Sequence, residues 1–337
     1  MKKIFLLIAI ASMTFCACNK SEIIENKEAA SFVASFDANT KTTLNNNLSQ
    51  SWLGGEVVKV LDVTDASQDT PVETTCTFTN IGPKGPKATF VADDPEFEFV
   101  EGHNYFVYYG GTLNSTNYST TLSKVEKALL LGLKFSTAYL YNPTGTYGLS
   151  DNQIPLASKF KYTGKASVQN IIFHNISSLL VLRVKNNSAE SKQVGYIQIE
   201  QSKQEWQTHM FGGALVPFSK TDDYSNPSTS YDFGGGSNAT YLAIVSFSSS
   251  TTIEPGETKD FAVCVMKPYN NVLSFDLTAQ IYDKKPGTIV ASAVKSGLSK
   301  TNFNGPGHTY VWSINITSSK ATNALNINPL GNNELAF

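Results

Sequence analysis

Residues 309–316 read TYVWSINI, and this stretch decides the fold class. Its bulky apolar side chains alternate with smaller ones, so they share one face of an extended chain: Tyr310, Trp312, Ile314 and Ile316. A period of two carried by aromatic and β-branched residues is typical of a half-buried β-strand. We therefore expect a strand here, and the same period extends through most of the chain.

Seven further runs in the second half of the chain have this character. They cover residues 169–173, 179–185, 195–200, 241–247, 260–266, 273–282 and 289–294. Turn signals such as Pro255-Gly256 and Pro286-Gly287 separate neighbouring runs, as short strands require. Strands at this spacing predict a β-sandwich over residues 161–316.

The first half of the chain also favours β-structure. Its predicted strands cover residues 31–37, 57–63, 75–79, 88–91, 96–100 and 105–109. In the first of them Phe32, Ala34 and Phe36 share one face. Gly82-Pro83 and Gly85-Pro86 supply turns between short strands. We expect a second all-β unit, an N-terminal β-sandwich, over residues 31–160.

One segment of the first half departs from the period of two. Ser123 and Glu126 have capping-box spacing, and Val125, Leu129 and Leu133 follow at helical intervals. This pattern predicts a short helix over residues 124–131 that ends near Gly132. An apolar run of this length is also compatible with a buried strand.

Length and charge limit the classes of protein that fit. A chain of 337 residues is about twice the usual domain length, so we expect two domains with a boundary near residues 154–164. Apolar residues make up 41% and charged residues 16%, a balance too apolar for a disordered chain. The formal charge of −2 and a single arginine, Arg183, disfavour nucleic acid and other polyanions as partners.

The N-terminus has the organisation of an export signal. Lys2 and Lys3 precede an apolar run over residues 4–15 that is too short to span a bilayer. Ala17 then precedes Cys18, and a small residue before a cysteine is the pattern that lipoprotein signal peptidase requires. We predict that Cys18 is lipidated. An ordinary secretory signal with incidental cysteines is the alternative.

Lipidation at Cys18 fixes the first part of the domain plan. Residues 1–17 become the signal peptide, and residues 18–30 become a polar, lipidated tether. Several acyl chains give lasting attachment without a spanning segment. The protein is therefore expected to be tethered to a membrane surface.

Signs of catalysis or of a cofactor are weak. The four histidines, His103, His174, His209 and His308, occur singly and without metal-ligand spacing. The two cysteines beyond the signal, Cys76 and Cys264, lie in apolar alternating runs, which favours buried packing. We expect no enzyme, no metal and no cofactor.

Short motifs in a fixed order along the chain resemble the fimbrillin family. They are TKTTL at 40–44, SWLGGE at 51–56, the aromatic strand at 105–109, IPLAS at 154–158, FHN at 173–175 and GHTYVW at 307–312. Lys41 and Glu56 stand where the family commonly has arginine and aspartate. The resemblance extends over residues 40–316.

The resemblance implies a structural subunit of a type V fimbria, either stalk or accessory and anchor, with two transthyretin-like β-sandwiches. Such subunits are exported as lipoproteins and contribute to cell adhesion. In stalk members a protease removes the N-terminal strand, and a terminal strand of the next subunit fills the vacated groove. The implied partners are other fimbrial subunits, the outer membrane, and a host protein or glycan.

The segments before and after the predicted sandwiches bear on this mechanism. Cleavage after Lys41 would remove the strand at residues 31–37 together with the lipid, although an arginine-specific protease has no target before Arg183. In the tail at residues 317–337, Leu325 and Ile327 alternate before Pro329, as a donor strand requires. A disordered end is the alternative for this tail.

A different class of function also fits the same anchor and fold. A surface glycan-binding lipoprotein would use aromatic loop residues such as Tyr118, Tyr141 and Tyr147 to stack on sugars. Ordinary loop packing is the competing interpretation of these tyrosines.

Overall fold

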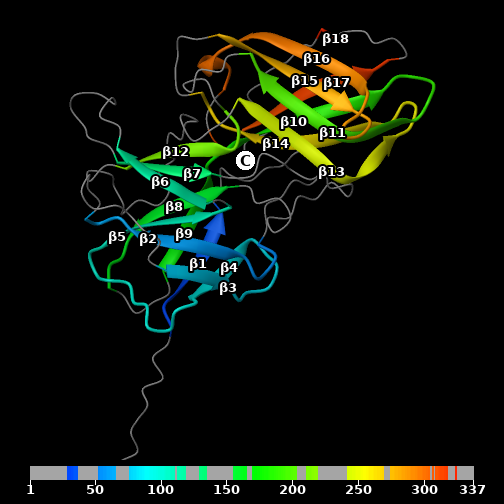
Figure 1. Ribbon diagram of the computed structural model, residues 1–337. Helices are drawn as coiled ribbons and strands as arrows, with labels where there is room; N and C mark the ends of the chain where they lie inside the picture. Colours follow the sequence, from blue (N-terminus) through cyan, green and yellow to red (C-terminus); the bar gives the residue numbers. More distant parts are fainter. Residues whose placement is uncertain are drawn as a thin grey trace, which may run out of the picture.

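The computed structural model is an all-β protein over the residues it describes (Figure 1). These are residues 29–36, 52–65, 76–110, 112–118, 129–134, 155–164, 169–202, 210–218, 241–268, 274–303, 306, 308–317 and 323–324. Within them a short 3-10 helix, Lys300–Asn302, is the only helical turn. The predicted all-β class is confirmed for this part of the chain.

Seven strands of the first unit form one closed barrel. In barrel order they are β1 (Ser31–Phe36), β4 (Lys87–Ala92), β3 (Cys76–Asn80), β2 (Val57–Asp62), β5 (Asn104–Tyr109), β8 (Leu156–Lys161) and β9 (Gln169–Asn175). Neighbours are antiparallel except at the closure, where β1 and β9 run parallel. The expected N-terminal sandwich is therefore a single closed sheet, and closure leaves no unpaired edge.

The second unit consists of two open sheets. The smaller has the order β14 (Thr258–Val265), β10 (Ser178–Asn186) and β17 (Thr309–Ile316). The larger has the order β13 (Leu242–Ile253), β11 (Lys192–Gln201), β15 (Phe275–Tyr282), β16 (Ile289–Leu298) and β18 (Asn323–Ala324). β10 and β17 run parallel, and β18 runs parallel to β16.

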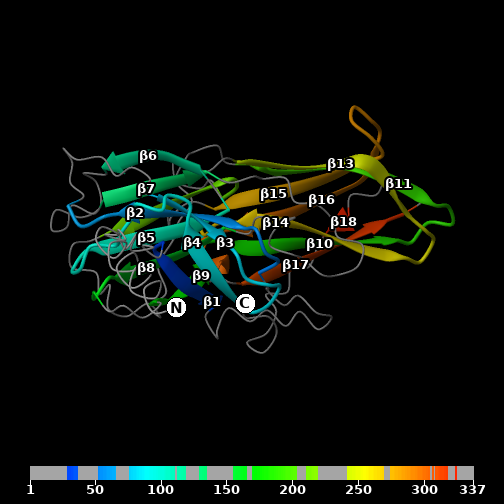
Figure 2. The same cartoon turned by 90° about the horizontal axis from the view of Figure 1, so that it is seen from below.

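A third sheet joins segments from the two halves of the sequence. It has the order β12 (Gly213–Phe218), β7 (Leu129–Lys134) and β6 (Thr112–Tyr118). β12 comes from the connection between β11 and β13, yet it pairs along its length with β7. Figures 1 and 2 both show β6 and β7 running beside the barrel strands β2 and β5.

Strand β5 of the barrel is buried on both of its faces. Tyr105 and Tyr109 point into the barrel, and the alternate residues Phe106 and Tyr108 point out of it. Phe106 and Tyr108 are nonetheless fully buried. Such a strand has other parts of the chain on both faces, and Figures 1 and 2 show β6 and β7 near this part of the barrel.

The helix predicted over residues 124–131 is wrong where the structure tests it. Residues 129–131 begin β7, which pairs with β6 on one side and β12 on the other. Pairing with two partner strands overrides the local capping pattern, because burial of an apolar run decides between helix and strand. Residues 124–128 lie outside the described residues.

The strand predicted over residues 96–100 is also wrong. The chain there is irregular, beginning at a turn in which the Asp94 side chain accepts a hydrogen bond from the Glu96 N–H (2.9 Å). Phe97 and Phe99 still pack against the core, with ring centroids both 5.5 Å from Phe78. The alternation is therefore real, but no neighbouring strand pairs with this segment among the described residues.

The other predicted strands are confirmed, with shifted ends. Besides β7, four described strands were not expected: β6, β8, β12 and β18. The division expected after residue 160 falls within β8, and it separates β9 from the barrel strands with which β9 pairs.

Candidate functional site

Strand β1 occupies a slot between two other strands of the barrel. Antiparallel pairing with β4 places Phe32 opposite Phe90 and Ala34 opposite Ala88. Parallel pairing with β9 places Ala34 beside Ile171. Both edges of β1 are therefore hydrogen-bonded, and the barrel is closed only while β1 is in place.

The side chains of β1 alternate between the core and the outside. Phe32 and Ala34 are fully buried, while Ser31, Val33 and Ser35 are half-buried. The Phe32 ring centroid lies 5.1 Å from that of Phe78 and 5.3 Å from that of Phe90. The strand thus fills side-chain pockets at alternate positions, as a strand added to a sheet does.

A buried tryptophan closes one end of this slot. The Phe36 ring stacks on the Trp52 ring with centroids 4.9 Å apart and an interplanar angle of 16°. Trp52 in turn meets three rings edge-on, those of Phe90, Tyr109 and Phe173. Trp52 therefore connects β1 to three other barrel strands, β4, β5 and β9.

The chain around Trp52 is fixed by backbone and carboxylate hydrogen bonds. Trp52 and Gly85 exchange two backbone hydrogen bonds of 2.8 and 2.9 Å. The buried Glu56 carboxylate accepts from the Gly54 N–H (2.9 Å) and from Asn80 Nδ2 (2.7 Å). Gly54 has a φ of 99°, which favours glycine. This role of Glu56 was not predicted from the sequence, where the available signal was Trp-Leu-Gly-Gly-Glu at residues 52–56.

The predicted processing and lipidation residues are not placed by the structure. Cys18 and Lys41 lie outside the described residues, as do Leu325 and Ile327. The structure does describe the strands that precede Lys41 and Leu325 in the chain. β1 ends five positions before Lys41, and β18 ends at Ala324, directly before Leu325.

Of the three tyrosines named for the glycan-binding alternative, the structure describes one. Tyr118 is the last residue of β6, whereas Tyr141 and Tyr147 lie outside the described residues.

Three of the four histidines lie within the described residues, each in a different element or connection. His103 Nδ1 is 2.6 Å from Asp62 Oδ2, His174 is buried in β9, and His308 directly precedes β17. His209 lies outside the described residues. No group of three or more metal-ligating side chains exists in the described part of the chain.

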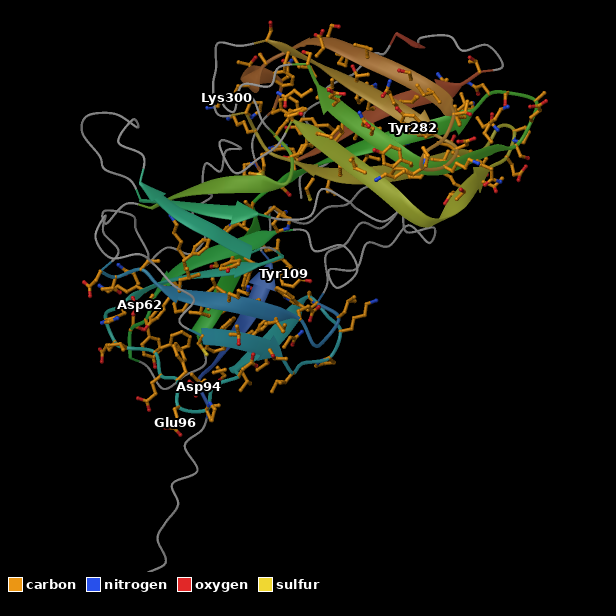
Figure 3. All side chains as sticks on the ribbon, viewed as in Figure 1. Asp62, Asp94, Glu96, Tyr109, Tyr282 and Lys300 are labelled. Atoms are coloured by element: carbon orange, nitrogen blue, oxygen red, sulfur yellow. The ribbon has the colours of Figure 1, made fainter. Side chains whose placement is uncertain are left out.

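His103 and Asp62 form a side-chain contact at the barrel end. Burial alone would raise the pKa of Asp62, but hydrogen bonds from His103 and Thr64 outweigh it and hold this pKa below its usual value. The Thr64 hydroxyl donates to Asp62 (2.6 Å) and accepts from the Asn104 N–H (2.9 Å). The carboxylate therefore fastens the end of β2 to the start of β5 (Figure 3).

The two described cysteines are core residues. Cys76 and Cys264 are free and buried, which confirms the packing prediction. Burial raises the pKa of the Cys76 thiol. Within the described ranges, no helix is both long and apolar enough to cross a membrane.

Comparisons with known proteins identify structural neighbours only. No family model matches the sequence, and no curated protein matches it. A candidate cell adhesion protein from Bacteroides ovatus matches with a TM-score of 0.43 and 11% identity, covering 90% of this chain and 95% of that one. A candidate cell adhesion protein from Bacteroides uniformis matches with a TM-score of 0.41 and 11% identity, covering 89% and 97%. The fimbrial anchor protein Mfa2 from Porphyromonas gingivalis matches with a TM-score of 0.29 and 10% identity, covering 84% and 90%.

Proposed function

We propose that this chain is a structural subunit of a surface fimbria, lipidated at Cys18 and assembled by strand exchange, and that it contributes to cell adhesion. The subunit is a stalk subunit where the chain is cleaved after Lys41, and an accessory or anchor subunit where it is not. The observation that carries the proposal is the position of β1, a barrel strand that comes first in the chain and lies before Lys41.

Removal of β1 would leave a groove suited to another strand. β4 and β9 would each expose a row of unpaired backbone N–H and C=O groups. The pockets of Phe32 and Ala34 would be empty in the barrel core. An incoming strand with alternating apolar residues satisfies the backbone groups and the pockets together.

The tail after β17 is the proposed source of that strand. Its residues Asn323–Ala324 form a short strand on the edge of β16, which supports a tendency of this segment to pair with a sheet. Leu325 and Ile327 follow with the alternation that a donor requires. Donor and groove are different surfaces, so contacts between copies are head-to-tail and produce a fibre.

The test is the N-terminus of the protein in surface fibres. Cells that make the chain are sheared, the released material is run on SDS gels without heating, and the N-terminal peptides are identified by mass spectrometry. We expect ladders of SDS-resistant polymer whose subunits begin at Thr42. Lys41→Ala should leave full-length, acylated monomer and no ladder.

Two controls separate processing from general damage. Lys84→Ala removes an exposed lysine from the turn between β3 and β4 and should leave ladder and N-terminus unchanged. Cys18→Ala should abolish incorporation of labelled palmitate. Sheared fibres that contain only acylated, full-length N-termini would refute strand exchange at the β1 slot.

A further inference from the structure

The larger sheet of the second unit carries an ordered polar and aromatic face that the proposed assembly does not use. On β11 and β15 the side chains of one parity, Ile197, Ile199, Ala279 and Ile281, are fully buried in the core. Those of the other parity pair across the strands on the opposite face, Tyr196 with Tyr282 and Gln198 with Gln280. With Glu200 and Lys285 these four residues form what we call the Tyr–Gln face.

The side chains of the Tyr–Gln face hold one another in place. The rings of Tyr196 and Tyr282 lie 5.3 Å apart, inclined at 58°. Tyr196 donates to Gln198 (3.3 Å), Tyr282 donates to Gln280 (2.9 Å), and Gln198 Nε2 donates to Glu200 (3.3 Å). Each tyrosine hydroxyl thus donates to the side-chain oxygen of a glutamine. Among the described residues nothing accepts a hydrogen bond from the side-chain N–H groups of Gln280.

A β-bulge turns Tyr196 toward this face. In a regular strand Val194 and Tyr196 would share one face, because they are two residues apart. The register with β13 shifts between them, so Val194 is fully buried in the core and Tyr196 lies on the outer face. The intervening Gly195 allows a close approach. A Cβ there would lie 2.6 Å from the Asp283 carbonyl oxygen and 2.8 Å from Ser250 Oγ. The glycine therefore lets the turn between β15 and β16 pack against β11.

This turn forms a rim at one end of the Tyr–Gln face. It is fixed by hydrogen bonds from the Asp283 N–H to the Thr288 carbonyl (3.1 Å) and from the Thr288 N–H to the Asp283 carboxylate (2.7 Å). Lys285 Nζ lies 5.2 Å from the centroid of the Tyr196 ring. Ile289, paired with Tyr282, is 39% exposed. Figure 3 shows Tyr282 on this sheet, near the end that the turn borders.

We propose that the Tyr–Gln face binds an uncharged oligosaccharide. Sugar rings present C–H groups on their faces, which suit the Tyr282 ring and the exposed Ile289, and hydroxyls at their edges, which suit Gln280 and Glu200. From Thr278 to Tyr282 the strand rises about 13 Å, so a short run of sugar units fits along it.

The chemistry of the face argues against other ligands. Glu200 and Lys285 balance in charge, so nothing on the face selects a phosphate, a sulfate or an acidic lipid. The backbone of β11 and β15 is already paired on both sides, so an extended peptide cannot join the sheet there. Rings and amides at fixed positions suit a ligand made of C–H faces and hydroxyls.

The test measures binding of the full chain to a glycan array that carries neutral, sialylated and sulfated glycans. We expect signal on neutral glycans, and isothermal titration with the best of them should give one site per chain. Tyr282→Ala and Gln280→Ala should each lower the association constant by about tenfold or more. Tyr282→Phe keeps the ring and should retain most of the affinity.

Gln193→Ala is the matched control, because Gln193 is an exposed glutamine of the same strand β11 outside the Tyr–Gln face. It should bind as the parent chain does. Thermal unfolding midpoints show that each variant is folded. Absence of binding to every neutral glycan, binding only to charged glycans, or equal affinities for Tyr282→Ala and Gln193→Ala would each overturn the proposal and leave the Tyr–Gln face a purely stabilising set of cross-strand pairs.

Discussion

Strands β1 and β10 occupy equivalent places in the two units of the molecule. Each is the first described strand of its unit, and each runs parallel to a strand late in the same unit: β1 beside β9, the last strand of the barrel, and β10 beside β17, the last strand of the smaller sheet. Each is antiparallel to its other neighbour, β4 or β14. The two strands nevertheless differ in how many of their side chains are buried and in how the chain connects them to other strands.

The difference lies in burial and in chain connection. β1 places two fully buried side chains in the core, and no strand precedes it among the described residues. β10 has nine residues, of which seven are buried, and it follows β9 after only two residues. One cut after β1 would release it, whereas β10 has covalent connections to folded strands at both ends. In the proposed assembly β1 is therefore the replaceable strand and β10 the permanent one.

The largest expected effect comes from the core side chain of the replaceable strand. Phe32→Ala should lower the free energy of unfolding of the uncleaved chain by about 3–5 kcal/mol, because the change leaves a cavity between Phe78 and Phe90. Urea denaturation measures this loss. In protein recovered from fibres that lack β1, the same substitution should have no effect on stability, and an equal loss there would show that β1 is retained.

The corresponding substitution in the permanent strand should act in every form of the protein. Leu182 is fully buried in β10, so Leu182→Ala should lower the free energy of unfolding by about 2–5 kcal/mol. Denaturation of monomer and of depolymerised fibre should show the same loss. A loss confined to one form would contradict the contrast between the two strands.

The Asp62–His103 contact of the barrel should add a smaller, pH-dependent contribution. The folded pKa of Asp62 is lowered, so its stabilisation is fully present above the unfolded value of about 3.9 and is lost as pH falls from there through the lowered folded pKa. Asp62→Asn should therefore cost at most about 1 kcal/mol at pH 7, and the cost should shrink as the carboxyl becomes protonated at acidic pH. Denaturation midpoints of parent and variant, measured from pH 7 down, should converge, and parallel curves would rule out this assignment.

The charged pair of the second unit should contribute least. Arg183 donates to both oxygens of Asp260 at 3.0 Å, and these contacts raise the pKa of Arg183, but the two side chains are 48% and 36% exposed. Arg183→Ala should cost about 0.2–1 kcal/mol, and less in high salt. A loss above about 2 kcal/mol would mean that this cross-strand pair helps to hold β10 in place.

Periodicity predicted most strands because it records which face of each strand is buried. Strand β17 shows this well, since Trp312, Ile314 and Ile316 are fully buried as their spacing predicts. The same signal failed over residues 96–100, where Phe97 and Phe99 reach the core without a paired neighbour. Periodicity reports burial, and hydrogen-bond partners are a separate property.

Partners far apart in the sequence could not be predicted. The first three residues of β7 were predicted as helix, with a buried strand as the alternative, and β7 depends on pairing with β6 and with β12, which begins 79 residues after the end of β7. The slot of β1 likewise depends on β9, and the role of Glu56 depends on Asn80. The alternation within the first strand was visible in the sequence, whereas the closed barrel around it was not.

The parallel pairing of β1 also has a mechanical consequence. A load that enters the chain ahead of Ser31 pulls β1 along its own axis, against five register pairs with β4 and five with β9. Loaded in this direction, the hydrogen bonds on both edges share the force and must break together instead of one after another. We therefore expect β1 to resist extraction by a force along its axis, although cleavage of one peptide bond after it would release it. In this direction the barrel would transmit tension, and proteolysis would open it more readily than pulling.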